Sequence, residues 1–171
     1  MNYSQSANFQ KTADMAVRFL AGTEHCNVAR LFQQKGFTCE LETESGSFFE
    51  SLVLDETDIS AHMKIYWGIS VNEQYRSKVE DFARRIGSYL GGDCTVGIDD
   101  SGRILSSTEL SYKEEVIETD AFERAEKACY EAIRLFHTTM TRLNCCGSIG
   151  QDESAQISGK EPIDEKEDYE K

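Results

Sequence analysis

The sequence predicts an α+β fold in which an antiparallel sheet carries helices mainly on one of its faces. Two observations indicate this class. Segments with apolar residues at helical spacing flank other segments in which apolar and polar residues alternate. Short sequences rich in Gly, Ser and Asp connect neighbouring alternating segments, which is typical of antiparallel hairpins rather than of long parallel crossovers.

The beginning of the chain is expected to be helical. Residues 6–22 place Phe9 and Leu20 on one apolar side and predict an amphipathic helix. Residues 23–36 predict a second, short helix, because Gly36 suits the left-handed position that follows a helix. One kinked helix and two separate helices are both consistent with the pattern.

A meander of three strands is predicted after Gly36. The segment "FTCELET" alternates, and the turn sequences "ESGS" and "DETD" then frame "FFESLVLD" and "ISAHMKIYWGIS". The third of these is the clearest, with apolar residues at every second position from Ile59 to Ile69. Since successive strand side chains point to opposite faces, one face of the sheet must be buried.

A helix and a hairpin are predicted to follow the meander. The segment "SVNE" matches a capping box, in which Ser70 and Glu73 start a helix that ends at Gly91. Two further strands, "CTVGI" and "RILSSTELSY", are joined by "DDSG", where Gly102 can adopt a positive φ.

The last predicted element is a helix with an acidic tail behind it. The helix starts near Thr119 or Asp120, and its apolar stripe runs from Phe122 to Leu143. Apolar periodicity then stops, so residues 1–146 are expected to form a single α+β domain and residues 147–171 an acidic, disordered tail.

The charge of the chain narrows its functional class. With 18 Lys and Arg against 31 Asp and Glu, its net charge is -13, which repels nucleic acids and anionic membranes. The first ten residues lack a basic and apolar leader, and no apolar run is long enough to span a bilayer. We therefore expect a soluble cytoplasmic protein that binds neither nucleic acid nor membrane.

The order helix, three strands, helix, two strands, helix resembles the arrangement shared by type III secretion chaperones and the YbjN family. The segments that carry the resemblance are "LFQQKGFTCELETESG" and "IDDSGRILSSTELSY", and it covers about residues 7–143. It implies an acidic, bacterial, non-enzymatic protein, often a homodimer, that holds a protein partner or acts in regulation. This is the leading functional hypothesis from the sequence.

Motifs of common enzymes are absent, in agreement with that hypothesis. The sequence contains no P-loop, no dinucleotide-binding glycine motif and no nucleophile elbow. The pairs Asp99 with Asp100 and Glu114 with Glu115 fit solvated turns, and His62 has no triad partner nearby in the sequence. No catalytic residue and no cofactor are predicted.

The six cysteines are expected to be reduced. Cys39, Cys94 and Cys129 lie in periodic segments, where a thiol acts as a small hydrophobe. In "TRLNCCGSIG" the helical stripe predicts that Cys146 is buried and that Cys145 faces solvent. Cys145 is therefore the candidate reactive thiol.

The alternative hypothesis is a thiol-dependent redox or metal-binding protein that uses Cys26, Cys145 and Cys146. Against it, adjacent side chains on a helix point about 100° apart, and the spacing of paired zinc ligands does not occur. A helix carboxyl end also disfavours a thiolate. No metal site is predicted from the sequence.

A partner-binding surface is predicted on the sheet. In "SFFESLVLD" alternate apolar residues join the core, which leaves Phe49 and Val53 on the opposite face beside Tyr66 of the next strand. Apolar groups exposed among charges mark interaction sites. The competing interpretation is that the first helix or the acidic tail covers this face.

Overall fold

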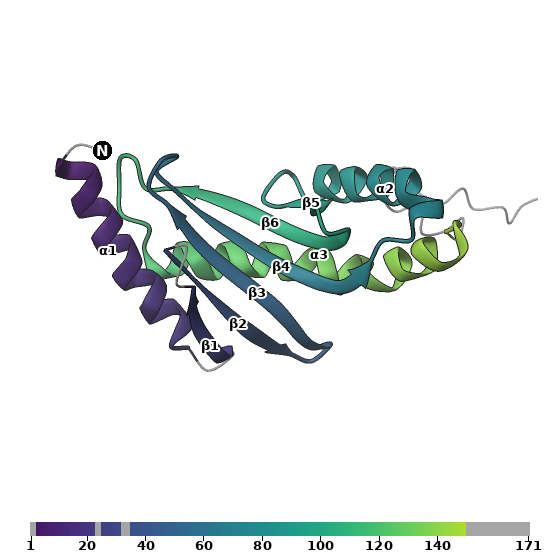
Figure 1. Cartoon of the computed structure of the whole chain (residues 1–171), viewed down its shortest axis with the longest axis horizontal. Coiled ribbons are helices and arrows are strands. Elements are labelled where there is room, and N and C mark those ends of the chain that lie inside the picture. The colour runs from purple at the N-terminus through teal and green to yellow at the C-terminus, as the bar shows by residue number, and fades with distance from the viewer. Residues whose placement is uncertain (1–2, 23–24, 32–34, 150–171) are drawn as a thin grey trace, which may run out of the picture.

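The computed structural model describes residues 3–22, 25–31 and 35–149 (Figure 1). Most of the predicted acidic tail, residues 150–171, lies outside the described residues. Along the chain the elements are α1 (Tyr3–Leu20), β1 (His25–Leu31), β2 (Gly36–Thr43), β3 (Gly46–Asp55), β4 (Ser60–Ser70), the 3-10 helix η1 (Glu73–Tyr75), α2 (Arg76–Tyr89), β5 (Thr95–Ile98), β6 (Arg103–Ser111) and α3 (Thr119–Cys146).

The strands form a six-stranded antiparallel sheet in the order β1-β2-β3-β4-β6-β5. The predicted α+β class, the meander β2-β3-β4 and the hairpin β5-β6 are therefore confirmed. Two registers matter for function: Cys39 lies opposite Glu50, and Phe49 lies opposite Tyr66. Both pairs lie on inner strands of the sheet, so backbone hydrogen bonds to the strands on either side fix their positions.

The helix predicted over residues 23–36 is wrong, because His25–Leu31 forms the edge strand β1. Its alternation is hidden by a bulge between Cys26 and Ala29, where Asn27 has a φ of 53°. An isolated helix of this length would also be marginal, whereas pairing with β2 satisfies the backbone. Gly36 belongs to β2 rather than to a helix end.

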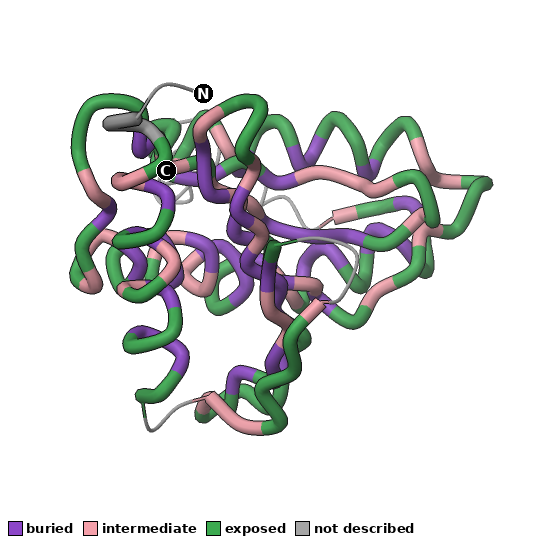
Figure 2. Tube along the Cα trace, turned by 60° about the vertical axis from the view of Figure 1, so that its left-hand side comes forward, coloured by how far each residue is buried: buried purple, intermediate pink, exposed green. Residues whose placement is uncertain are grey.

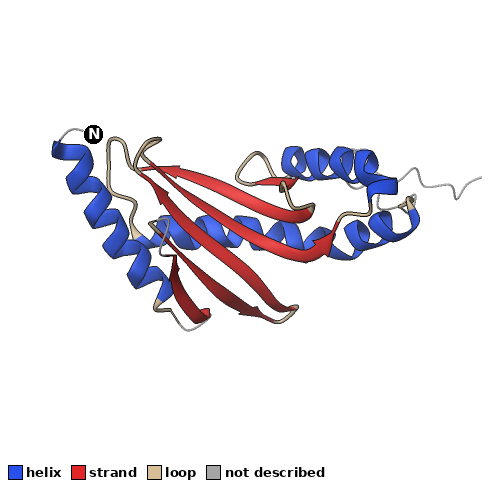
Figure 3. Ribbon diagram, viewed as in Figure 1, coloured by secondary structure: helices blue, strands red, loops and turns tan. Residues whose placement is uncertain are grey.

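Helix α3 covers one face of the sheet along its length. Its 28 residues span about 42 Å and run behind the strands in Figure 3. Phe122, Cys129 and Met140 are fully buried in its stripe, and Ser106 of β6 donates a 2.9 Å hydrogen bond to the Cys129 carbonyl. Buried positions alternate with exposed ones along the trace (Figure 2).

The other helices pack on the same side as α3. The ring of Phe19 from α1 stacks on Phe122 at a centroid distance of 5.6 Å, and Phe82 from α2 meets Phe136 edge-on at 6.2 Å. The opposite side of the sheet therefore receives no helix from the described chain.

No helix among the described residues is both long and apolar enough to cross a membrane.

The start of α2 differs from the capping box predicted at Ser70. Strand β4 continues through Ser70, which pairs with Arg103, so the sheet already uses this stretch of backbone. Asn72 accepts the capping hydrogen bond instead, from the Gln74 amide at 3.1 Å. Glu73 pairs with Arg76 rather than reaching back along the chain.

The end of α3 corrects the prediction that Cys146 is buried, since Cys145 and Cys146 are both exposed. The buried stripe passes from Leu143 to Gly147, which ends the helix with a φ of 70° and packs against the ring of Tyr75. Asn144 is buried beside Leu143 and links α3 to the end of β4 by a 2.9 Å hydrogen bond to the Ser70 carbonyl.

Replacing Phe122 by Ala is expected to lower the free energy of unfolding by about 3–5 kcal/mol, because it leaves a cavity between α1, α3 and the sheet. Urea unfolding followed by circular dichroism measures the change. The matched control is Leu135→Ala, which truncates an exposed side chain of the same helix and should change stability by less than about 1 kcal/mol. Equal losses in both variants would contradict the packing of α3.

Cys145 and Cys146 are expected to react with an alkylating reagent at similar, fast rates in the native chain, because both side chains are exposed. The buried thiols of Cys39, Cys94 and Cys129 should react only after unfolding. Mass spectrometry of peptides sampled over time gives the rate at each site. Slow labelling of Cys146 alone would show that the helix continues its buried face through that residue.

Candidate functional site

One side of the sheet, here termed the open face, carries an aromatic pair. The open face is the side of β2, β3, β4 and β6 that points away from α3. Phe49 is 45% exposed, and its ring centroid lies 5.6 Å from that of Tyr66 on the neighbouring strand. The predicted contact between these two residues is therefore confirmed, whereas a role in binding stays a prediction.

The third predicted residue, Val53, lies on the open face but apart from the aromatic pair. It is opposite His62, four residues along β3 from Phe49, which corresponds to about 13 Å. Val53 is half-buried. It therefore extends the apolar surface along β3 without touching the rings.

Charged groups surround the aromatic pair. The Arg103 guanidinium lies 4.3 Å from the Tyr66 ring centroid and forms a 2.7 Å ion pair with Asp99. On the other side, Phe49 is opposite Glu40 of β2, which is exposed. The rings thus lie between a fixed cation and a carboxylate.

The open face also contains a depression. A depression of about 350 Å³ is lined partly by His62, Lys64 and Glu109. The buried side chains of α1 pack with those of α3, so α1 does not cover the open face as the competing interpretation required. Whether the tail covers it concerns residues outside the described ranges.

A second feature lies on the other side of the sheet, beneath α3. We call it the buried carboxylate cluster, formed by His25, Cys39, Glu50 and Glu126. The Glu50 side chain is 0% exposed, and neither of its carboxylate oxygens has a hydrogen-bond partner among the described residues. Burying a carboxylate without such partners costs several kcal/mol, so this arrangement needs a compensating charge.

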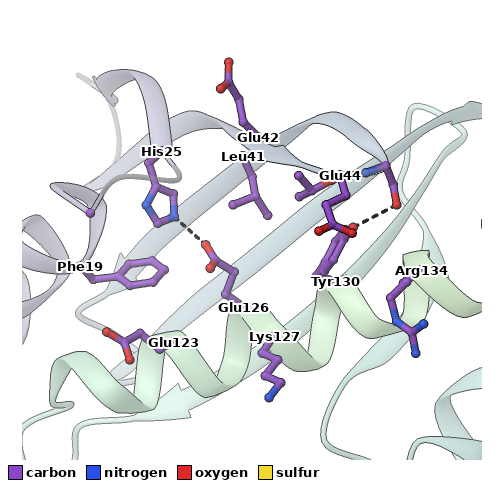
Figure 4. A pocket seen from close by; sticks show the side chains of 13 residues that line it. Phe19, His25, Leu41, Glu42, Glu44, Glu123, Glu126, Lys127, Tyr130 and Arg134 are labelled. Carbon is purple, nitrogen blue, oxygen red and sulfur yellow. Dashed lines mark hydrogen bonds and ion pairs between the residues drawn. The ribbon is translucent and has the colours of Figure 1, made fainter.

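His25 supplies part of that charge. Its Nε2 lies 2.5 Å from Glu126 Oε1 (Figure 4). The same nitrogen lies 3.7 Å from Glu50 Oε2. Burial lowers the pKa of His25, but the hydrogen bond with Glu126 and the negative charges of Glu126 and Glu50 outweigh it and raise that pKa to about 10. The ring of Phe19 meets the imidazole edge-on at 4.7 Å and holds it in place.

The pKa values of two other members, Glu50 and Cys39, are also raised. Burial raises the pKa of Glu50 to about 7, although His25 opposes the effect. Burial and the carboxylates of Glu50 and Glu126 raise the pKa of the Cys39 thiol well above its usual range. In the absence of another cation, the buried carboxylate cluster therefore retains protons.

A cavity of about 780 Å³ leads to the cluster from solvent. It lies between the start of β1, the end of β2 with the turn that follows it, and α3, with His25 and Glu126 in its wall (Figure 4). Tyr130 and Ser45 share a 3.0 Å hydrogen bond across it. Small solutes can thus reach the imidazole without unfolding of the sheet.

Two groups of side chains in the described residues have the donor types and spacing that a metal ion needs. The ligand atoms of His25, Cys39 and Glu50 all lie within 4.8 Å of one another, as do those of Asp55, Asp58 and His62. In the second group, Asp55 Oδ1 already accepts hydrogen bonds from the amides at 57 and 58. Only the first group combines nitrogen, sulfur and oxygen donors in a buried setting.

The thiols of the alternative hypothesis do not converge. Cys26 lies on β1 with its sulfur 3.5 Å from the Glu40 carbonyl, and burial together with Glu42 raises its pKa, which disfavours a thiolate. Cys26 is next to His25, which contacts Glu126 of α3. Cys145 follows Glu126 by 19 residues of the same helix, or about 28 Å, so it lies far from Cys26. The structure therefore provides no shared site for Cys26, Cys145 and Cys146.

Sequence reasoning missed the buried carboxylate cluster, although part of its signal was present. Glu50 is in phase with Phe48 and Leu52, and Glu126 follows Phe122 by one helical turn, so both carboxylates lie in apolar stripes. His25 could not be placed because its segment was predicted to be helical. The convergence of β1, β2, β3 and α3 is a tertiary property.

Comparison with known proteins shows the fold. No family model and no curated protein matches the sequence. Two solved structures are similar. One is the HopA1-SchA chaperone-effector complex, with 14% identity and a TM-score of 0.55 over 78% of this chain and 97% of that chain. The other is the ExsC-ExsE complex, with 14% identity and a TM-score of 0.51 over 86% and 100%.

These similarities confirm the type III secretion chaperone-like fold expected from the order of elements. The relation to the YbjN family stays a prediction.

The stability of the metal-free chain is expected to fall as the pH rises from about 5 to about 10. The pKa of Glu50 rises from 4.5 to about 7 and that of His25 from 6.5 to about 10, so the folded state holds both protons more tightly than the unfolded chain. The stabilisation from each proton is complete below the unfolded-state pKa and disappears above the folded-state pKa.

Urea unfolding at a series of pH values, with a chelator present, measures this dependence. His25→Gln should flatten it between about pH 7 and 10, and Glu50→Gln between about pH 5 and 7. His62→Gln, outside the cluster, serves as the matched control. An unchanged profile in both cluster variants would mean that these groups do not exchange protons on folding.

Proposed function

We propose that this protein is a non-enzymatic binding protein that holds a segment of another protein on its open face. The observation that carries the proposal is the Phe49 and Tyr66 pair, which lies among charges on a face that no described helix covers. An aromatic pair of this kind can anchor a partner, since a few buried aromatic contacts supply most of the affinity of an interface.

The similar structures support the binding role. One of them is named as a chaperone-effector complex, and the other as a complex of two proteins. A chaperone acts by binding, which favours a non-enzymatic role for this chain as well. We further propose, from the same resemblance, that the protein is cytoplasmic, regulatory and bacterial, and that it forms a homodimer.

The expected partner segment combines apolar and basic residues. The apolar residues match the rings of Phe49 and Tyr66 and the side chain of Val53. The basic residues match the net charge of -13, which draws cations toward the chain, and the exposed carboxylates of Glu40 and Glu109 on the same face. Its affinity should therefore fall as salt is added.

A photo-crosslinking residue placed at position 49 is expected to capture a protein partner in cells of the native host. In the purified complex, Phe49→Ser should raise the dissociation constant at least about tenfold, because it removes an aromatic anchor. The cross-linked peptide, identified by mass spectrometry, should contain both basic and apolar residues.

The matched control places the same photo-crosslinking residue at position 135. Leu135 is 40% exposed, but it belongs to α3 on the other side of the sheet. Identical products from both positions would contradict the proposal. Products that contain only a second copy of this chain would also contradict it, because the open face would then be a homodimer interface.

A further inference from the structure

The buried carboxylate cluster is not required for the binding role proposed above, and its unsatisfied atoms call for a separate explanation. Both oxygens of Glu50 are buried without hydrogen-bond partners among the described residues. The side chains involved are nearly inaccessible, at 0% for Glu50 and 4% for His25. Groups of this kind are rare in folded proteins unless a ligand or an ion completes them.

We infer that the cluster is a binding site for a zinc-type divalent metal ion, with His25, Cys39 and Glu50 as ligands and Glu126 completing the coordination. Imidazole nitrogen, thiolate sulfur and carboxylate oxygen are the donor types that Zn²⁺ takes. The three central ligand atoms lie within 4.8 Å of one another. They come from neighbouring strands of the sheet, which fixes their relative positions.

One ligand-to-ligand distance already matches tetrahedral coordination. With metal-to-ligand bonds of 2.0–2.3 Å, ligand atoms around Zn²⁺ lie roughly 3.3–3.8 Å apart. The distance from His25 Nε2 to Glu50 Oε2 is 3.7 Å. The His25 to Glu126 contact of 2.5 Å is a hydrogen bond, so the Glu126 carboxylate must move outward by about 1 Å to share the ion.

The surroundings suit a bound cation. The cavity of about 780 Å³ gives a route from solvent to His25 and Glu126, the two members that line it. The lining also includes Glu42, Glu44 and Glu123 against Lys127 and Arg134, so its net charge is negative and favours entry of a cation. Binding would release the proton of the Cys39 thiol and that of His25 to solvent.

A bound ion would hold the edge strand to the rest of the fold. His25 is the first residue of β1, whereas Cys39 belongs to β2, Glu50 to β3 and Glu126 to α3. One ion coordinated by all four would therefore link the bulged edge strand to the central strands and to the long helix. The predicted consequence is a higher melting temperature in the presence of metal.

The test begins with a background that lacks the three thiols that are not buried, Cys26→Ser, Cys145→Ser and Cys146→Ser, because these could bind metal adventitiously. After treatment with a chelator, this protein is titrated with Zn²⁺ and with Co²⁺. We expect one equivalent of each to bind, an absorption band from thiolate-to-cobalt charge transfer, and a rise in melting temperature with Zn²⁺.

Substitutions in the cluster identify the ligands. Cys39→Ser should abolish the charge-transfer band, and Glu50→Gln should weaken Zn²⁺ binding at least about tenfold, the loss typical of residues that merely orient a ligand. Glu126→Gln should also weaken Zn²⁺ binding. Because Glu126 lies nearer the surface, this variant tests the site even if the core variants fail to fold. Circular dichroism of the metal-free variants checks their folding.

Two matched controls keep the proposal falsifiable. Glu123→Gln changes an exposed carboxylate of the same cavity, and His62→Gln changes the second cluster of potential ligands; both should bind as the background does. The proposal is wrong if the background binds no metal, if the cobalt band survives Cys39→Ser, or if His62→Gln removes binding. Failure here would leave the proposed protein-binding role untouched.

Discussion

The packing of α3 against one face of the sheet determines both functional regions of this molecule. The helix extends about 42 Å, and its buried stripe joins two hydrophobic clusters, one around α1 and the other around α2. Because all three helices lie on that side, every second residue of the central strands is committed to the core. The residues between them form the open face, so its exposure is a consequence of the packing.

The same packing explains why carboxylates are buried in the core, where they destabilise the fold unless their charge is compensated. Strand alternation sends Glu50 into the core, and the helical stripe brings Glu126 toward it. A buried carboxylate with two unsatisfied oxygens destabilises the fold unless a cation lies nearby. His25 provides one partial solution through a proton, and a divalent metal ion would provide a stronger one.

The central part of the fold could be predicted from the sequence because its patterns are local. Strand β4 alternates over its whole length, and the stripe of α3 repeats from Phe122 to Leu143, so both elements were recognised. Strand β1 was not, since a bulge at Asn27 interrupts its alternation and its stability comes from pairing with β2. Its misassignment also concealed the position of His25.

The candidate sites show the same division between local and tertiary information. The contact between Phe49 and Tyr66 follows from alternation in two adjacent strands, so the sequence was sufficient. The prediction that Cys146 is buried was wrong, because the end of α3 depends on how Gly147 packs against Tyr75, a contact between distant segments. The resemblance to secretion chaperones depended on the order of elements, which tolerates the loss of one edge strand.

The most direct test of this account is hydroxyl-radical footprinting of the chain alone and with its partner. Tyr66 and Trp67 are neighbours on β4, but Tyr66 lies on the open face and Trp67 is 1% exposed beneath the helices. We predict rapid oxidation of Phe49 and Tyr66 in the free chain, slow oxidation of Trp67, and loss of the rapid reaction once the partner binds. If Tyr66 were as protected as Trp67 in the free chain, or if the partner left its rate unchanged, the open face would not be the binding surface.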